Sequence, residues 1–119
     1  EMVGTAWLVA TVIGSGIGGD AASSDVGVAL LGNTLATLGC LYVLITIFAK
    51  ISGAHFNPVV TAAFCLRREM RPQTAAGYWI AQFSGAFIGT LVAHMMYELP
   101  AVSWDGKARD SDGEVAAEA

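Results

Sequence analysis

The sequence predicts an all-α membrane protein with three transmembrane helices and one re-entrant half-helix. The composition is 55% hydrophobic and only 13% charged, with a mean hydropathy of +0.58, whereas soluble domains average about 25% charged residues. The charges are also segregated, because residues 26–49 and 73–97 contain no Asp, Glu, Lys or Arg. Between these two runs, an Asn-Pro step precedes a short apolar segment, which indicates a half-helix.

The three uncharged runs are long enough to cross a bilayer. At 1.5 Å per residue, residues 26–49 and 73–97 each extend over about 36 Å as helices, and a hydrocarbon core is about 30 Å thick. Residues 2–19 form a shorter run at the lower limit for a span. Buried helices of a soluble protein are the alternative, but 119 residues are too few to surround three such segments with polar surface. We therefore expect spans at about 2–19, 26–49 and 73–97, with a polar turn at 20–25 and a polar loop at 98–119.

The distribution of charge predicts the orientation. The basic residues gather between the second and third spans, and two acidic residues lie between the first and second. The positive-inside rule then places residues 50–72 in the cytoplasm, with the N-terminus on the same side. We expect a multi-pass protein of a bacterial inner (plasma) membrane.

Small residues recur at helix-contact spacing in each span. Such pairs let helix backbones approach closely where lipid supplies no hydrophobic driving force. The pairs are Gly14 with Gly18, Gly32 with Ala36, and Gly85 with Gly89. They predict a tight bundle.

The connection between the second and third spans is predicted to be a re-entrant loop and half-helix at about 51–67. Asn57 has the chemistry of an N-cap, and Pro58 is suited to the first helical position, where no N–H is needed. Arg67 and Arg68 complement the negative pole of the helix dipole at the far end. The pattern predicts about three helical turns, half a membrane thick, after an extended stretch.

The residues ahead of Asn57 predict a pore. A residue that precedes proline is driven to extended geometry, so residues 52–55 cannot be helical up to this step. Their carbonyl groups would lack partners at membrane depth unless they line a water-filled cavity. A helix N-terminus aimed into such a cavity repels cations and protons, whereas neutral molecules that donate and accept hydrogen bonds can pass.

Residues 52–61 resemble the first signature of the aquaporin (major intrinsic protein) family, Ser-Gly-Ala-His-x-Asn-Pro-Ala-Val-Thr. Glu1-x-x-Gly4-Thr5 is similar to the opening of the family's first helix, and residues 78–86 to its third. Residues 33–37 and 94–100 are similar to a bacterial branch of aquaglyceroporins associated with arsenic resistance. The resemblance covers essentially the whole chain.

The resemblance implies roles for the signature residues. The Asn57 amide would donate to the solute at the centre of the pore, while Pro58 and Val59 help to hold the end of the half-helix. A row of backbone carbonyl groups would face the solute, namely those of Gly53, Ala54 and His55. Glu1 would accept hydrogen bonds from the loop. The His55 side chain is interpreted as bracing the loop rather than as a ligand or proton carrier.

Two positions depart from the usual family pattern. Val59 stands where the family has alanine, and this larger side chain could narrow or shift the constriction. Thr37, 20 residues before Asn57, aligns with a filter position that often holds a bulky aromatic. A threonine there predicts a wider filter, which favours glycerol-like polyols, urea or neutral metalloid hydroxides over strict water selectivity.

The chain contains one repeat, whereas family members contain two in inverted topology. Residues 113–119 resemble the approach to the family's fourth helix, so we expect a chain cut at the repeat boundary. The alternative is a half-channel that pairs with an antiparallel copy of itself. The expected partners are the lipid bilayer, a second inverted repeat and, by resemblance, three further copies in a homotetramer.

The predicted function is passive conduction of small uncharged solutes with exclusion of ions and protons. One alternative is half of a secondary transporter, which would need an intramembrane acidic residue; Glu1 is the only candidate. A structural membrane subunit is another alternative, although it would not use a proline-capped half-helix. No nucleophile–base pair, metal cluster or phosphate loop appears in the sequence. We therefore expect no enzymatic activity, cofactor, metal or nucleic acid partner.

Overall fold

The computed structural model describes residues 1–98, which form four helices joined by short connections. These are α1 (Met2–Ala22), α2 (Val26–Ser52), α3 (Pro58–Leu66) and α4 (Pro72–Met96). By length and composition, α1, α2 and α4 could each cross a membrane. The nine-residue α3 is the predicted half-helix. The predicted fold class is thus confirmed, and the loop expected over 99–119 lies outside the described residues.

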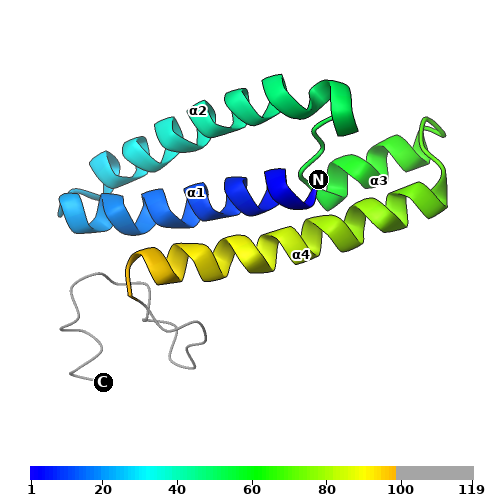
Figure 1. Ribbon diagram of the computed structural model, residues 1–119. Helices are drawn as coiled ribbons and strands as arrows, with labels where there is room; N and C mark the ends of the chain where they lie inside the picture. The colour runs from blue at the N-terminus through cyan, green and yellow to red at the C-terminus, as the bar shows by residue number, and fades with distance from the viewer. Residues whose placement is uncertain (99–119) are drawn as a thin grey trace.

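The helix α1 lies at the centre of the arrangement (Figure 1), with α2 on one side and α4 on the other. The short α3 packs against α4 only, and it lies beyond the N-terminus of α1. The loop from α2 to α3 passes the start of α1 on its way. Glu1 is therefore next to the segment that the sequence singled out as a pore element.

The helix ends follow from local sequence, with two differences from the prediction. The side chain of Asp25 caps α2 by accepting from the N–H groups of Gly27 and Val28. The first helix continues through Ala22 rather than ending at residue 19, because nothing before Ser23 breaks it. The second helix continues through Ser52 rather than ending at residue 49, because its left-handed C-cap is Gly53.

The contact between α1 and α4 is made by backbone against backbone. A Cβ atom added to Gly85 would collide with the carbonyl oxygen of Met2, and one added to Gly89 would collide with that of Ala6. Both glycines are buried, as is Ala93 one turn further on. The small-residue pair predicted in this span therefore has the role expected of it, close helix approach.

The other two small-residue pairs behave differently. Gly14 and Gly18 lie under the ring of Tyr97, whose hydroxyl donates to the Gly14 carbonyl at 2.9 Å. Gly32 meets no atom within 4 Å of where its Cβ would be. Gly32 is exposed, so within residues 1–98 it makes no close helix contact.

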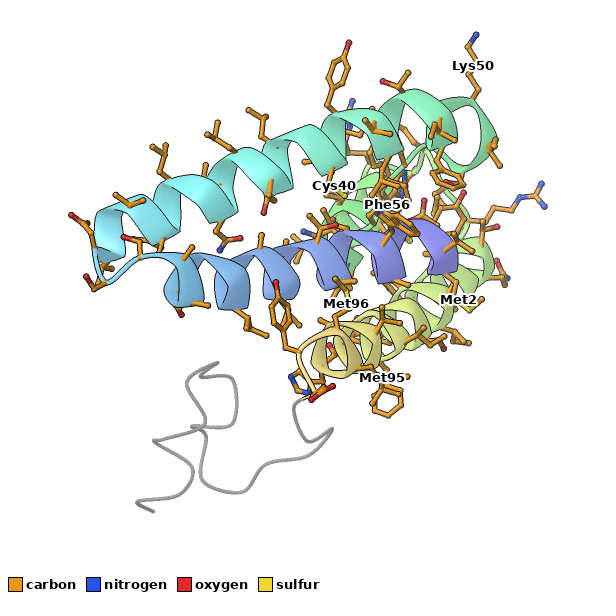
Figure 2. All side chains as sticks on the ribbon, turned by 60° about the vertical axis from the view of Figure 1, so that its left-hand side comes forward. Met2, Cys40, Lys50, Phe56, Met95 and Met96 are labelled. Atoms are coloured by element: carbon orange, nitrogen blue, oxygen red, sulfur yellow. The ribbon has the colours of Figure 1, made fainter. Side chains whose placement is uncertain are left out.

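Large apolar side chains cover the outside of the helices. Figure 2 shows side chains projecting outward along α2, with Lys50 at its end pointing away from the bundle. Leu35, Leu38 and Tyr42 on this helix are each more than half exposed, at 59%, 63% and 73%. By contrast, Phe56 is buried between α2 and the first turn of α1. An apolar exterior of this extent suits lipid or other membrane helices rather than water.

Candidate pore element

The half-helix α3 begins at Asn57, whose backbone is extended, with φ −151° and ψ 125°. Its side-chain oxygen Oδ1 accepts a hydrogen bond from the Val59 N–H at 2.9 Å, and Pro58 occupies the first helical position. Because the oxygen is engaged in the cap, the amide Nδ2 is the end of this side chain that is left to donate. Within residues 1–98, Nδ2 of Asn57 has no acceptor, and the residue is exposed.

The backbone ahead of Asn57 is not simply extended, which corrects the expectation for this stretch. Gly53, Ala54 and Phe56 adopt positive φ angles of 84°, 51° and 49°. The left-handed region costs a residue with a Cβ about 1–2 kcal/mol. Such strain persists only where surrounding contacts over-determine the conformation, and here the contacts come from Glu1.

The carboxylate of Glu1 accepts four hydrogen bonds from three different segments. Its Oε1 accepts from the Ser52 hydroxyl at 2.7 Å and from the His55 N–H at 3.1 Å. Its Oε2 accepts from the Phe56 N–H at 2.7 Å and from Nε2 of Gln82 on α4 at 3.0 Å. One side chain at the start of α1 thus joins the end of α2, the loop and α4.

A second polar contact continues from Gln82 into the half-helix. Nε2 of Gln82 also donates to the hydroxyl of Thr61 at 2.9 Å, and the Thr61 hydroxyl lies 3.0 Å from Nδ1 of His55. Thr61 and Gln82 are almost fully buried, with 0% and 1% of their surface exposed. The His55 ring stacks on Phe64 of α3, with centroids 4.6 Å apart. The imidazole is therefore held between the loop and the half-helix.

Two aromatic side chains of α4 fasten the ends of the loop. The Tyr78 hydroxyl donates to the Ser52 carbonyl at 2.7 Å, and Nε1 of Trp79 donates to the Pro58 carbonyl at 3.0 Å. The Tyr78 bond satisfies the carbonyl of Ser52, the last residue of α2, which has no partner within that helix. The Trp79 bond joins the first turn of α3 to α4.

Three carbonyl groups in the loop between Ser52 and Pro58 have no donor in the described part of the chain. Within residues 1–98, no donor reaches the carbonyl oxygens of Gly53, Ala54 or His55, although the N–H groups of His55 and Phe56 are engaged by Glu1. Gly53 is exposed and the other two residues are half-buried. The loop therefore offers hydrogen-bond acceptors close to the amide donor of Asn57. A water molecule or a solute with hydroxyl groups can accept from the amide and donate to these carbonyl groups.

The remaining predicted site residues lie outside this network. Val59 is 74% exposed, and its aliphatic side chain takes no part in the hydrogen bonds of the network. Thr37 is half-buried on α2, and its hydroxyl lies 3.5 Å from Oδ1 of Asn33. The structure thus groups Thr37 with polar residues of α1 and α2, and not with Asn57.

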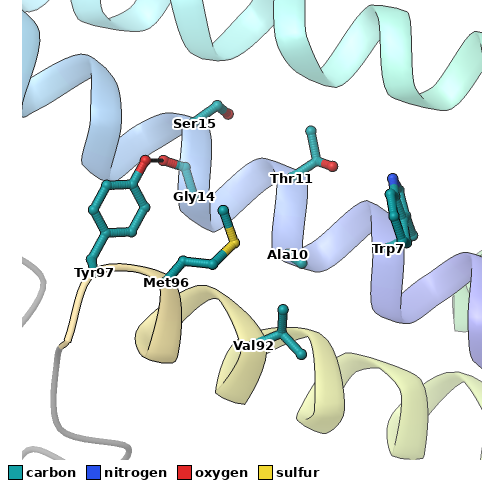
Figure 3. A pocket seen from close by; sticks show the side chains of 8 residues that line it. All are labelled: Trp7, Ala10, Thr11, Gly14, Ser15, Val92, Met96 and Tyr97. Atoms are coloured by element: carbon teal, nitrogen blue, oxygen red, sulfur yellow. Dashed lines mark hydrogen bonds between the residues drawn. The ribbon is translucent and has the colours of Figure 1, made fainter.

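A cavity of about 430 Å³ opens elsewhere, at the far end of α1 and α4 (Figure 3). Figure 3 shows Tyr97 closing one side of it through the hydrogen bond to Gly14. Its lining is mostly apolar, and it includes Trp7, Val92 and Met96. None of the signature residues faces it. Within the described chain, no group of three or more His, Cys, Asp or Glu side chains could hold a metal ion.

Sequence reasoning assigned no role to Gln82, Thr61 and Tyr78, which hold the loop in place. All three lie within stretches that resemble the family, but the hydrogen bonds by which Tyr78 and Gln82 hold the loop and α3 join residues 21 to 81 positions apart in sequence. A polar glutamine in an otherwise apolar span was the one available signal. Such a side chain is found buried only with hydrogen-bond partners.

Three apolar helices of spanning length and a proline-capped half-helix, braced by a carboxylate, define a multi-pass membrane protein with a re-entrant element. Residues 1–117 match the family model described as Major intrinsic protein. The chain belongs to this family. No solved structure matches it.

Curated relatives agree with this assignment. Over 109 residues the chain is 47% identical to "Aquaglyceroporin AqpS" of Rhizobium meliloti (strain 1021), covering 92% of this chain and 47% of the relative. It is 37% identical over 97 residues to "Probable aquaporin PIP2-8" of Oryza sativa subsp. japonica, covering 82% and 35%. It is 35% identical over 103 residues to "Neurogenic protein big brain" of Drosophila melanogaster, covering 87% and 14%. The chain therefore spans less than half of the length of these relatives.

Proposed function

We propose that this chain forms one repeat of a passive channel for water and small uncharged solutes such as glycerol. The observation that carries the proposal is the Asn57 side chain. Its oxygen caps α3, and within residues 1–98 its amide hydrogens and the nearby carbonyl groups of residues 53–55 have no partner. A solute at this point can accept from the amide and donate to the carbonyls, which replaces part of its hydration shell.

The same element accounts for exclusion of ions. The N-terminus of α3 carries a partial positive charge, about half an elementary charge for a helix. Within residues 1–98, Glu1 is the acidic residue that is hydrogen-bonded to the loop ahead of Asn57, and its carboxylate accepts four hydrogen bonds from the protein. It is therefore engaged as a brace and is not free to bind a cation. A cation in front of α3 meets positive potential with no free carboxylate to offset it.

The proposed assembly contains a second repeat of inverted topology, whose half-helix meets α3 end to end. The relatives support this, because the chain covers only 47% and 35% of the first two. The open face of Asn57 and the exposed Val59 are where that partner would lie. We propose a homotetramer in a bacterial inner membrane, with residues 50–72 on the cytoplasmic side.

For selectivity we propose a wide filter that admits polyols. Thr37 supplies a small polar side chain where the family often has an aromatic, and a relative named an aquaglyceroporin supports the same preference. Urea and neutral metalloid hydroxides are further candidate solutes. A change of one such side chain is worth about 1–3 kcal/mol of discrimination.

The test is a flux measurement in proteoliposomes that contain the two-repeat channel. Glycerol and water permeability should both rise above those of empty vesicles, without electrical current and without dependence on a proton or sodium gradient. A flux that requires either gradient would instead identify a secondary transporter. An absence of any flux, with the protein correctly inserted, would favour a structural subunit.

The role of Thr37 has its own test. Thr37→Phe should reduce glycerol permeability more than water permeability, because an aromatic ring narrows the filter for the larger solute. An equal loss of both would show that Thr37 does not set the width.

A further inference from the structure

The turn that joins α3 to α4, residues 67–71, is the most basic part of the described chain. It holds three arginines and one glutamate, a net charge of +2. This turn lies at the opposite end of the bundle from the turn between α1 and α2 (Figure 1), where Asp20 and Asp25 are found. Within residues 1–98, the two ends of the molecule therefore differ in the sign of their charge.

Two of the three arginines in this turn keep their charge uncompensated. The third, Arg67, places its Nη2 2.7 Å from Oε1 of Glu69, the acidic residue of the turn. Within residues 1–98, neither Arg68 nor Arg71 has a salt-bridge partner, and both residues are exposed. Two guanidinium groups are therefore available to an anion that approaches this end of the molecule.

The two arginines line a hollow of about 470 Å³ in the surface of the turn. Met70 and Pro72 contribute apolar walls to the same hollow. Leu66, the last residue of α3, is 84% exposed directly before the arginines. The first turn of α4, which begins after Arg71, contains no acidic side chain. The hollow therefore combines positive charge with apolar surface.

The backbone at Arg68 has a conformation that favours glycine. The N–H of Glu69 donates to the Phe64 carbonyl at 3.1 Å, and the N–H of Arg68 donates to the Cys65 carbonyl at 3.0 Å. These two bonds form a Schellman motif at the end of α3, in which Arg68 takes the left-handed position with φ 61°. An arginine here makes the turn less stable than a glycine would. Its presence is explained if the guanidinium group binds something.

We propose that Arg68 and Arg71 form a docking surface for the phosphate group of an anionic phospholipid, with Leu66 and Met70 against the apolar part of the same lipid. Charge complementarity supports this partner, because guanidinium groups bind phosphate oxygens through paired hydrogen bonds, and basic pockets beside membrane helices hold anionic headgroups. The turn lies at the level of such headgroups, since α2 ends and α4 begins at this end of the bundle and both are of spanning length. The proposal is independent of which solute the channel conducts.

The experiment titrates the full-length protein in detergent with phosphatidylglycerol, with phosphatidylcholine as the zwitterionic comparison, and counts bound lipids by native mass spectrometry. Arg68→Gly removes the guanidinium group and leaves a residue that suits the backbone, so the thermal midpoint should not fall. Each basic residue near a headgroup contributes a factor of about five in affinity. Arg68→Gly and Arg71→Gln should therefore each weaken phosphatidylglycerol binding about five-fold. Lys50→Gln is the matched control, because it removes the same charge at the same end of the bundle from a side chain that points away from it, and it should leave the affinity unchanged.

Three results would overturn the proposal. The first is phosphatidylcholine binding as tight as that of phosphatidylglycerol, which would mean that the headgroup charge is not recognised. The second is an equal loss of affinity in Lys50→Gln and in the two arginine variants, which would indicate a general effect of net charge. The third is displacement of phosphatidylglycerol by an equal concentration of inorganic phosphate, which would show a site for free anions instead of a lipid surface.

Discussion

The helix α1 is fixed to its surroundings in two different ways. Along α4 the contact is backbone against backbone, because Gly85 and Gly89 lie directly against carbonyl groups of α1. At its N-terminus the contact is polar, with Glu1 accepting four hydrogen bonds. In a bilayer, close approach through small residues gains van der Waals contact, whereas a carboxylate specifies one geometry for the groups around it. The first contact sets the spacing of the helices, and the second sets the shape of the loop.

The largest effect is expected from a side chain introduced into the close contact between α1 and α4. Gly85→Val places a branched side chain against the carbonyl of Met2, so α1 and α4 cannot approach and the folded channel should be lost. Size-exclusion chromatography in detergent should show aggregated protein. Gly77→Val, in the same helix, is the control, because a Cβ there meets no atom within 4 Å. A monodisperse, conducting Gly85→Val protein would show that the close approach is dispensable.

The next largest effect is expected from removing the Glu1 carboxylate, which holds the loop by hydrogen bonds. Glu1→Ala leaves the N–H groups of His55 and Phe56 and the Ser52 hydroxyl without the acceptor that they have in Glu1. The Gln82 amide keeps one of its two acceptors, the Thr61 hydroxyl. Each buried unpaired group costs about 1–3 kcal/mol, so the thermal midpoint should fall steeply and conduction should be lost. Glu69→Gln is the control, since Glu69 makes only an exposed ion pair with Arg67. An Ala variant that conducts normally would refute the bracing role of Glu1.

A smaller effect is expected at the buried hydroxyl between the loop and α3. Thr61→Val keeps the shape of the side chain but removes the partner shared by Gln82 and His55. The expected loss is about 1–3 kcal/mol of stability, seen as a lower thermal midpoint in detergent. Thr46→Val should have little effect, because the Thr46 hydroxyl donates only to the Tyr42 carbonyl within α2.

The smallest effect is expected from relieving backbone strain. Ala54→Gly removes the left-handed penalty of about 1–2 kcal/mol at φ 51°, but glycine adds an entropy cost of about 0.5–1 kcal/mol. Stability should therefore rise by between about 0 and about 1.5 kcal/mol, with conduction retained. Ala54→Val should do the reverse, since a β-branched residue tolerates this conformation poorly. A lower thermal midpoint for the glycine variant would mean that residue 54 is not strained.

The contrast between the two contacts also explains what could be predicted from sequence. The start of α3 was predictable because Asn57 and Pro58 act within a few residues of each other, as an N-cap and a first helical residue. The pair Gly85 and Gly89 was visible as a spacing of four within one helix, although the same spacing at Gly32 makes no such contact and the partners of Gly85 and Gly89 lie on α1. In both cases the signal in the sequence is local.

The shape of the loop was not predictable in the same way. Ala54 and Phe56 are left-handed because Glu1, more than 50 residues away, accepts from the N–H groups of His55 and Phe56. Local preference alone favours extended backbone there. The environment of Thr37 was likewise missed, since it depends on Ser15 of another helix through Asn33.

The Asn57 side chain has two roles, and this limits which residues can replace it. The oxygen stabilises the half-helix and the nitrogen faces the proposed path of the solute, so the two tasks cannot be altered separately. Asp or Ser at this position could still cap α3, but neither offers an amide hydrogen. Any replacement that leaves the fold intact thereby changes the polarity of what a passing molecule meets. Variation that is neutral for folding is therefore not neutral for permeation at this residue.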